Sequence, residues 1–257
     1  MTKKYLLPLL ALSPLLVAHP VEAKEKQVTV ATAGDIRPFS YEKDGELTGY
    51  DIEVLKAADK VMPDYKFQFK KTSWESIFVG LDSDHYQVAA NNLSYTEERA
   101  EKYLYSNPIA TNPLVLVSRE EAKVNDLSEI GGLTTQDDTG TSTAKLVTDW
   151  NAKHKNNPSK INYSGEDVSK RLLDLENGEF DYLIFDKISV DTIIDQKGLD
   201  LEVVEIDTDS NPNNYIIFSD DQEDLKESFD KALKKLDQTG KLEKLSEKYL
   251  GGNYLVK

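Results

Sequence analysis

The chain has 257 residues, of which 39% are hydrophobic and 30% are charged. This composition is typical of a globular protein, and the length suffices for one large domain or two modest ones. The net charge of −15 and the isoelectric point of about 4.7 argue against nucleic acid as a partner. The absence of cysteine excludes disulfides, thiolate metal sites and thiol nucleophiles.

Residues 1–23 are typical of a secretory signal peptide. Lys3 and Lys4 form its positive start, Leu6–Ala18 is apolar, and Ala23 supplies the small residue of a cleavage site. The alternative is a membrane anchor, but the apolar stretch is short for a span of about 20 residues and is interrupted by prolines. We therefore expect export to the extracellular or cell-envelope side of the membrane, without a lipid-anchor cysteine.

The next segments alternate between strand-like and helix-like patterns. Residues 28–31 form a β-type run, residues 50–61 place apolar side chains on one helical face, and residues 65–70 alternate aromatic and polar side chains. A helix capped by Ser73 and a strand over 86–90 follow. The order strand, helix, strand, helix, strand implies parallel strands joined by crossover helices.

A second αβ series begins at the β-type run 114–117. Its helices are expected to start at Gly140–Thr143 and at Ser164, and a buried strand over 182–185 ends at Asp186. The last elements are a strand over 215–218 and two amphipathic helices separated by a glycine.

Proline-marked breaks near 108–113 and 209–214 bracket this second series. We therefore expect two αβ lobes. Lobe 1 comprises residues 24–110 plus 214–257, and lobe 2, residues 111–213, is inserted into it. The chain then crosses between the lobes twice, and two crossing segments make a hinge.

The chemistry of a few polar or aromatic side chains makes them candidate ligand contacts. Arg99 could hold both oxygens of a carboxylate, or it could be a surface arginine. Gly140–Ser142 could present N–H groups to an anion or simply cap a helix. Asp186 ends a strand, where ligands bind in open αβ sheets, or it is a helix N-cap. Trp74 is either a core residue or a ligand wall.

Catalytic and metal motifs are absent from the sequence. The three histidines are scattered, so no catalytic triad or histidine metal site is indicated. Asp207, Asp209 and Asn211 have the spacing of a calcium loop, but Pro212 and Phe218 occupy the positions of its glycine and glutamate. We expect no catalytic residue, no metal and no cofactor.

In their order and spacing, these stretches resemble the family 3 solute-binding proteins, the extracellular receptors of polar amino-acid ABC importers. The resemblance covers nearly the whole chain after residue 23. It is carried, in chain order, by Arg37–Tyr41, Gly45–Glu53, Ser94–Arg99, Ser106–Pro108, Asp126-Leu127 with Gly131, Gly140–Ser142, Gly178–Asp181, Asp186, Gly240 and Lys248–Gly251. It implies an α/β fold of the periplasmic-binding-protein-like type II, with discontinuous lobes joined by a two-strand hinge.

The resemblance also implies roles for individual residues. Arg99, with backbone N–H groups near Ser94 and at Thr141–Ser142, would bind the ligand α-carboxylate. Asp186, with a carbonyl near Asn92 and the Ser94 hydroxyl, would bind the α-ammonium. Because the two charged residues are expected on different lobes, only a closed form satisfies both, and closure is coupled to binding.

Departures from the family pattern bear on the ligand's side chain. Ala33 and Ile36 stand where the family often has an acidic and an aromatic residue. One wall of the pocket for the ligand's side chain is therefore less polar than usual in the family and offers less aromatic stacking. Trp74 matches the family's other aromatic wall. Residues 91–96 followed by residues 102–106 are most similar to cystine-type receptors of Gram-positive bacteria. The implied protein is a monomeric receptor that binds a polar α-amino acid, cystine being favoured, and delivers it to an ABC permease.

Two other functions fit the same fold. A dehydratase acting on a cyclic carboxylate would need a general acid or base beyond Asp186, and the sequence offers no obvious candidate. A ligand-sensing module of a signalling receptor would need transmembrane and cytoplasmic segments, and none is expected after residue 23.

Overall fold

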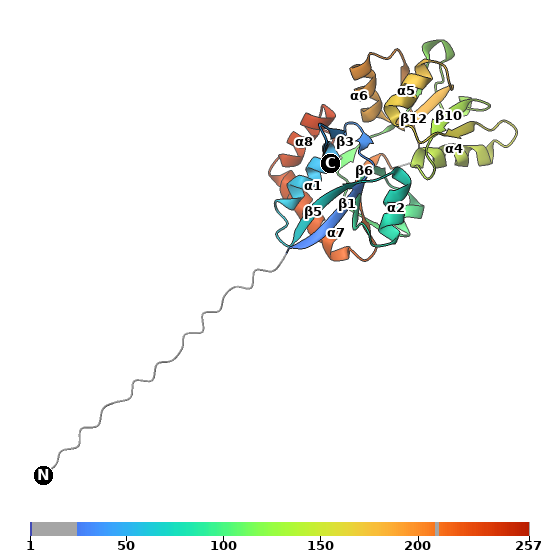
Figure 1. The fold of residues 1–257 in the computed structure, drawn as a ribbon. Helices are drawn as coiled ribbons and strands as arrows, with labels where there is room; N and C mark the ends of the chain where they lie inside the picture. The colour runs from blue at the N-terminus through green and yellow to red at the C-terminus, as the bar shows by residue number, and fades with distance from the viewer. Residues whose placement is uncertain (2–24, 209–210, 257) are drawn as a thin grey trace.

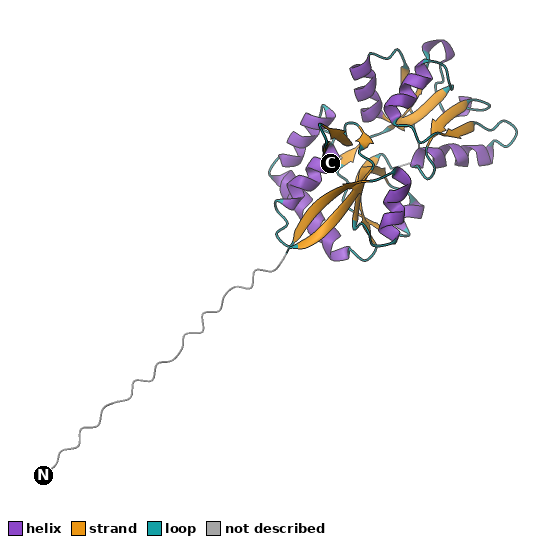
Figure 2. Cartoon of the chain, in the orientation of Figure 1, coloured by secondary structure: helices purple, strands orange, loops and turns teal. Residues whose placement is uncertain are grey.

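The computed structural model describes residue 1 and residues 25–208 and 211–256. Residues 2–23 of the predicted signal peptide lie outside this part of the chain. Two lobes lie next to each other, and in each lobe helices flank the strands (Figures 1 and 2). Within the described residues, no helix has the length and apolar character needed to cross a membrane.

The first lobe is built on a mixed sheet. Its strands follow the order β5-β1-β6-β14-β7, and β8 also pairs with β14. Parallel pairing joins β1 to β5 and β6, as the alternating pattern predicts, whereas β14 runs antiparallel to its neighbours. The bounds are β1 Lys26–Thr32, β5 Tyr65–Lys71, β6 Val88–Ser94, β7 Tyr103–Tyr105, β8 Ala110–Thr111 and β14 Asn213–Ser219.

Both faces of this sheet are covered, because successive side chains of a strand point to opposite faces. Val30 joins a core cluster with Leu55 of α1 and Phe229 of α7, whereas the next residue, Ala31, joins a cluster with Ile77 of α2. A small sheet of β2, β3 and β4 lies beside α1. The bounds are β2 Asp35–Ile36, β3 Ser40–Lys43, β4 Glu46–Thr48, α1 Tyr50–Asp59, α2 Trp74–Asp82, α3 Glu97–Ala100, α7 Glu223–Gln238 and α8 Lys241–Leu250.

The second lobe contains an antiparallel sheet in the order β12-β9-β13 and a parallel pair, β10-β11. Two core clusters lie on its two sides, one including Leu172 of α5 and the other Val147 of α4. The bounds are β9 Leu114–Ser118, η1 Glu120–Ala122, η2 Leu127–Glu129, β10 Thr134–Asp137, α4 Ser142–Lys153, β11 Lys160–Tyr163, α5 Val168–Glu176, β12 Tyr182–Asp186, α6 Lys187–Lys197 and β13 Glu202–Glu205. The prediction that Ser164 caps α5 is wrong, because Asp167 accepts a hydrogen bond from the Lys170 N–H at 2.9 Å.

Two segments of chain connect the lobes, and they lie side by side. One runs from β8 into β9, and the other runs from β13 into β14. The Asn112 N–H donates to the Pro212 carbonyl oxygen at 2.6 Å, which joins the two segments directly. The Pro113 carbonyl in turn accepts a hydrogen bond from the Lys187 N–H, at the start of α6. A change in the angle between the lobes must therefore pass through these few residues.

Candidate functional site

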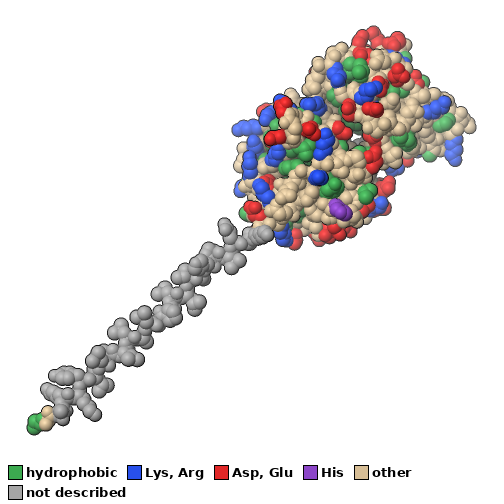
Figure 3. All heavy atoms as spheres, viewed as in Figure 1, with side chains coloured by type: hydrophobic (Ala, Val, Ile, Leu, Met, Phe, Trp, Pro, Cys, Tyr) green, Lys and Arg blue, Asp and Glu red, His purple; other side chains and the backbone are tan. Residues whose placement is uncertain are grey.

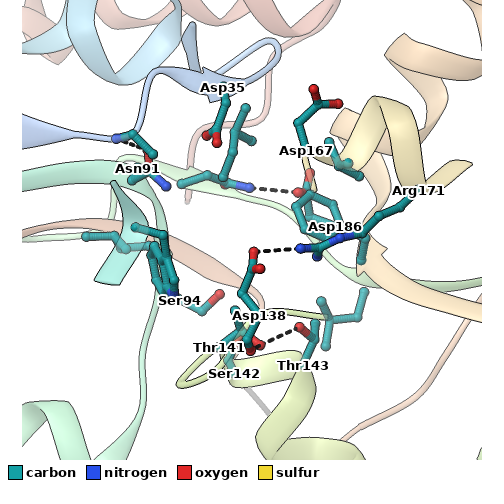
Figure 4. A pocket seen from close by; sticks show the side chains of 18 of the residues that line it. Asp35, Asn91, Ser94, Asp138, Thr141, Ser142, Thr143, Asp167, Arg171 and Asp186 are labelled. Atoms are coloured by element: carbon teal, nitrogen blue, oxygen red, sulfur yellow. Dashed lines mark hydrogen bonds and ion pairs between the residues drawn. The ribbon is translucent and has the colours of Figure 1, made fainter. Parts of the chain in front are cut away.

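A cavity lies between the lobes and is lined by residues of both (Figure 4). Lobe 1 contributes from β2, α2, β6 and α3, and lobe 2 contributes from β9, α4, α5 and β12. All the ligand contacts expected from the sequence line this one cavity: Ile36, Trp74, Asn92, Ser94, Arg99, Thr141, Ser142 and Asp186. Acidic side chains lie on both sides of the hollow between the lobes on the face shown in Figure 3.

Arg99 reaches from lobe 1 to lobe 2. Thr96 caps the short helix α3, and this cap orients Arg99 into the protein, where the residue is 9% exposed. Its guanidinium carbon lies 4.7 Å from the centre of the Phe78 ring. Nη2 donates to the Gly140 carbonyl at 2.9 Å, and Nη1 donates to the Ser94 carbonyl at 3.4 Å. Burial lowers the pKa of Arg99, and the guanidinium remains a cation at neutral pH.

Asp186 is both a helix cap and a cavity residue, so the two alternatives left by the sequence hold together. It is 7% exposed, and Oδ1 accepts from the Ser189 N–H at 2.8 Å and from Asn112 Nδ2 at 2.6 Å. Oδ2 accepts from Asn92 Nδ2, across the cleft, at 2.7 Å. Burial raises the pKa of Asp186, and these hydrogen bonds oppose that effect by stabilising the carboxylate.

Asn92 links Asp186 to the lobe 1 interior. Its φ of 52° is left-handed, a conformation that asparagine tolerates better than most residues. Its backbone N–H donates to Oδ2 of the fully buried Asp51 at 2.7 Å, and its side-chain oxygen accepts from Asn214 Nδ2. The family resemblance implied a carbonyl near Asn92 as a ligand contact. The structure adds that the Asn92 side-chain amide donates a hydrogen bond to the Asp186 carboxylate.

The lobe 2 wall at the start of α4 is held by a buried carboxylate. Thr141 caps α4 by accepting from the Ala144 N–H at 3.0 Å, and its hydroxyl donates to Asp137 Oδ1 at 2.8 Å. Thr143 donates to the other oxygen of Asp137 at 2.7 Å. Ser142 follows the cap as the first residue of α4 and also lines the cavity. The free N–H groups of this first helical turn can therefore serve an anion.

Trp74 belongs to the core and to the cavity at once. It packs edge-on against Phe78 with 5.5 Å between ring centroids, and its Nε1–H donates to the Thr139 carbonyl of lobe 2 at 3.0 Å. Ile36, at the end of β2, is partly buried on another wall of the cavity. These two side chains give the cavity apolar surface next to its charged groups.

Several charged lining residues were missed by the sequence analysis: Asp35, Asp138, Glu166, Asp167 and Arg171. Only Arg171 left a usable signal. It occupies the same helical face as Val168, Leu172 and Leu175, so a cation interrupts an apolar stripe that is buried in the structure. A charged residue at such a position requires a partner.

Residues 28–252 match the family model of the bacterial extracellular solute-binding proteins, family 3. The chain belongs to this family. The L-cystine-binding protein TcyJ of Bacillus subtilis is 29% identical to the chain, with 92% of this chain and 88% of that protein covered. The L-cystine-binding protein TcyA of the same organism is 30% identical, with 89% and 82% covered.

Solved structures agree with this assignment. One comes from work on glutathione import in Gram-positive bacteria via GshT and the cystine ABC importer TcyBC of Streptococcus mutans. It superposes with a TM-score of 0.89 at 49% identity and covers 91% of this chain and 98% of that one. A putative L-cystine ABC transporter from Listeria monocytogenes gives 0.83 at 28% identity, with 90% and 98% covered.

The family assignment confirms the resemblance derived from the sequence and its two-lobed fold of the periplasmic-binding-protein-like type II. The family is described as one of extracellular solute-binding proteins. The dehydratase-like alternative is therefore not favoured.

Proposed function

We propose that this protein is the receptor of an amino-acid ABC importer, which captures a ligand between its lobes and delivers it to the permease. One observation carries the proposal. Arg99 of lobe 1 and Asp186 of lobe 2 line the same cavity, and each is more than nine-tenths buried. An α-amino acid carries one carboxylate and one ammonium on neighbouring atoms, so it requires one cation and one anion in its site.

Ligand binding would replace contacts within the protein by stronger contacts between the protein and the ligand. Its carboxylate would replace the Gly140 carbonyl as the acceptor for Arg99, and its ammonium would replace the Asn92 amide as a donor to Asp186. Each exchange places an opposite charge against a group whose present partner is neutral, so it adds Coulomb attraction to a hydrogen bond that is already charge-assisted. Because Arg99 and Asp186 approach from opposite lobes, the ligand would favour the closed arrangement.

Cystine is the favoured ligand, and glutathione is a second candidate. The two Bacillus subtilis relatives described above, TcyJ and TcyA, are named for cystine. The solved structure with 49% identity comes from work on glutathione import through a cystine importer. Both molecules carry a free α-amino acid group at one end and sulfur in the middle, so both suit the proposed pair of Arg99 and Asp186.

Calorimetry with cystine, glutathione and a panel of free amino acids tests the proposal. Arg99→Ala and Asp186→Asn should each weaken binding at least tenfold, because each loses an ionic hydrogen bond of about 1.5–3 kcal/mol. The asparagine at 186 can still cap α6. Lys70→Ala and Asp195→Asn, exposed positions on the same two lobes, should bind like the wild type. Failure of every ligand to bind below about 100 μM would refute the proposal.

We further propose that residues 1–23 are removed on export and that the protein acts as a monomer. Lobe 1 would comprise residues 24–110 and 214–257, and lobe 2 residues 111–213. Intact mass of the exported protein gives the cleavage site, and sedimentation equilibrium gives the oligomeric state. A mass that includes the first 23 residues, or a dimer at micromolar concentration, would contradict the corresponding statement.

A further inference from the structure

Arg171 is a buried cation in the cavity wall for which the proposed amino-acid contacts provide no role. It lies on α5 and is 2% exposed. Nη2 is 2.7 Å from Asp138 Oδ2, and Nη1 is 3.8 Å from Asp137 Oδ1. In the described part of the chain, neither Nε nor Nη2 has a hydrogen-bond partner of good geometry, despite the short ion pair with Asp138.

An unsatisfied buried donor is expensive for the fold. Leaving one such group without a hydrogen bond destabilises the folded state, and more so when the group is charged. Arg171 is therefore an unusual residue to retain on an apolar helix face. Arg171 lines the cavity, its hydrogen-bonding capacity is only partly used, and its planar guanidinium suits a carboxylate.

Arg171 is separated from Arg99 by a single loop. The Gly140 carbonyl of this loop accepts from Arg99, and the carboxylate of Asp138, two residues earlier, pairs with Arg171. Figure 4 shows Asp138 between the start of α4 and Arg171. The two arginines thus serve different parts of the cavity, and a carboxylate on Arg99 leaves Arg171 free.

Two more carboxylates face this part of the cavity from opposite lobes. Asp35 belongs to β2, and Asp167 is the N-cap of α5 (Figure 4). The pKa of Asp35 is raised, first by partial loss of contact with water and then by the charges of Asp167 and Asp138, although the residue is exposed overall. The lobes therefore bring like charges near each other when no ligand lies between them.

The charge balance restricts what can bind here. Five acidic residues line the cavity against two arginines: Asp35, Asp138, Glu166, Asp167 and Asp186 against Arg99 and Arg171. A lone carboxylate on Arg171 would meet an excess of negative charge. A carboxylate with an N–H donor beside it satisfies both the arginine and the neighbouring aspartates.

We propose that Arg171, Asp138, Asp35 and Asp167 form a second polar subsite, which binds a terminal carboxylate on Arg171 and the adjacent N–H group on the aspartates. The proposal rests on the proposed function, in which Arg99 and Asp186 hold the first end of the ligand. The ligand then has two polar ends, and its middle lies against the apolar lining of Ile36, Leu93, Leu114 and Phe185. Cystine offers a second ammonium at this end, and glutathione offers an amide N–H next to its glycine carboxylate.

Calorimetry with cystine, glutathione and S-methylcysteine separates the two ends. S-methylcysteine has only the first end, so the wild type should bind cystine or glutathione at least tenfold more tightly. Arg171→Met should bring that ratio close to one, and Arg99→Ala should weaken all three ligands. Asp195→Asn should keep the wild-type ratio.

Asp35→Asn gives an independent readout, because Asp35 is exposed and its loss should not affect folding. The variant should lose several-fold in affinity for cystine, whose second ammonium loses an ionic partner, and change little for glutathione, whose amide can still donate to asparagine. If the ratio of the affinities for cystine and S-methylcysteine is the same as in the wild type in both Arg171→Met and Asp35→Asn, the second subsite is overturned. If the wild type binds none of the three ligands, the proposed function itself fails.

Discussion

Asp51 is fully buried at the start of α1, directly behind the site, and its protonation should control stability. Burial raises its pKa from 3.8 to about 7, the hydrogen bond from the Asn92 N–H lowers it, and the charge of Asp186 raises it. Oδ1 has no hydrogen-bond partner among the described residues. The helix N-terminus favours the ionised form by only about 0.3–1 kcal/mol, so it does not outweigh the loss of hydration.

The sign and size of the effect follow from this pKa. The folded protein holds the Asp51 proton more tightly than the unfolded chain, whose pKa is near 3.8. The stability from the protonated form is fully present below about pH 4 and is lost as the pH rises through 7. A shift of roughly three pKa units corresponds to about 4 kcal/mol, of which about 3 kcal/mol falls between pH 5 and pH 8.

Asp51→Asn removes this titration and keeps an oxygen for the Asn92 N–H. Urea unfolding of both proteins at several pH values gives the difference in their unfolding free energies. We expect this difference to move by about 3 kcal/mol in favour of the variant between pH 5 and pH 8. Asp195→Asn, an exposed change, should follow the wild type. Parallel pH profiles for wild type and Asp51→Asn would show that Asp51 is ionised throughout and refute the reasoning.

Two further predictions concern the backbone and the cleft. Asn92→Gly keeps the left-handed conformation but removes the amide that ties Asp186, so the free protein should have a larger radius of gyration in X-ray scattering. An unchanged radius would mean that this tie does not hold the lobes. Gly49→Ala should lower the unfolding free energy by about 1–3 kcal/mol or more, because its φ is 115° and its Cβ would lie 2.3 Å from the Phe39 carbonyl oxygen. Gly45→Ala, where the Cβ would meet nothing within 4 Å, should cost less in the same urea titration.

The local elements were predictable because they follow from side-chain periodicity. The alternation of aromatic and polar side chains over residues 65–70 predicted β5, and the apolar helical face over residues 50–61 predicted α1. The partners of β14 were not predictable in this way. It sits beside β6 in the lobe 1 sheet, although more than a hundred residues separate the two strands in sequence, and its antiparallel pairing depends on how the chain returns from lobe 2.

The candidate site, too, was only partly predictable from local sequence patterns. Arg99 and Asp186 each had a plausible alternative role, and only the order of motifs along the chain set them together. Arg171 was hidden because a helix with Val168, Leu172 and Leu175 on one face is recognised by its apolar residues alone. The left-handed Asn92 and its contact with Asp51 depend on tertiary packing, and no local pattern marks them.

The contacts across the cleft limit what the first end of the ligand can contribute. Asp186 already accepts hydrogen bonds from Asn92, Asn112 and Ser189, so an ammonium gains only the difference between its own bond and that of the Asn92 amide it displaces. Arg99 likewise gives up a carbonyl that it already holds. Every α-amino acid offers these two exchanges equally. Discrimination among ligands must therefore come from the rest of the cavity, where Arg171 is a cation whose Nε and Nη2 lack a well-directed hydrogen bond among the described residues.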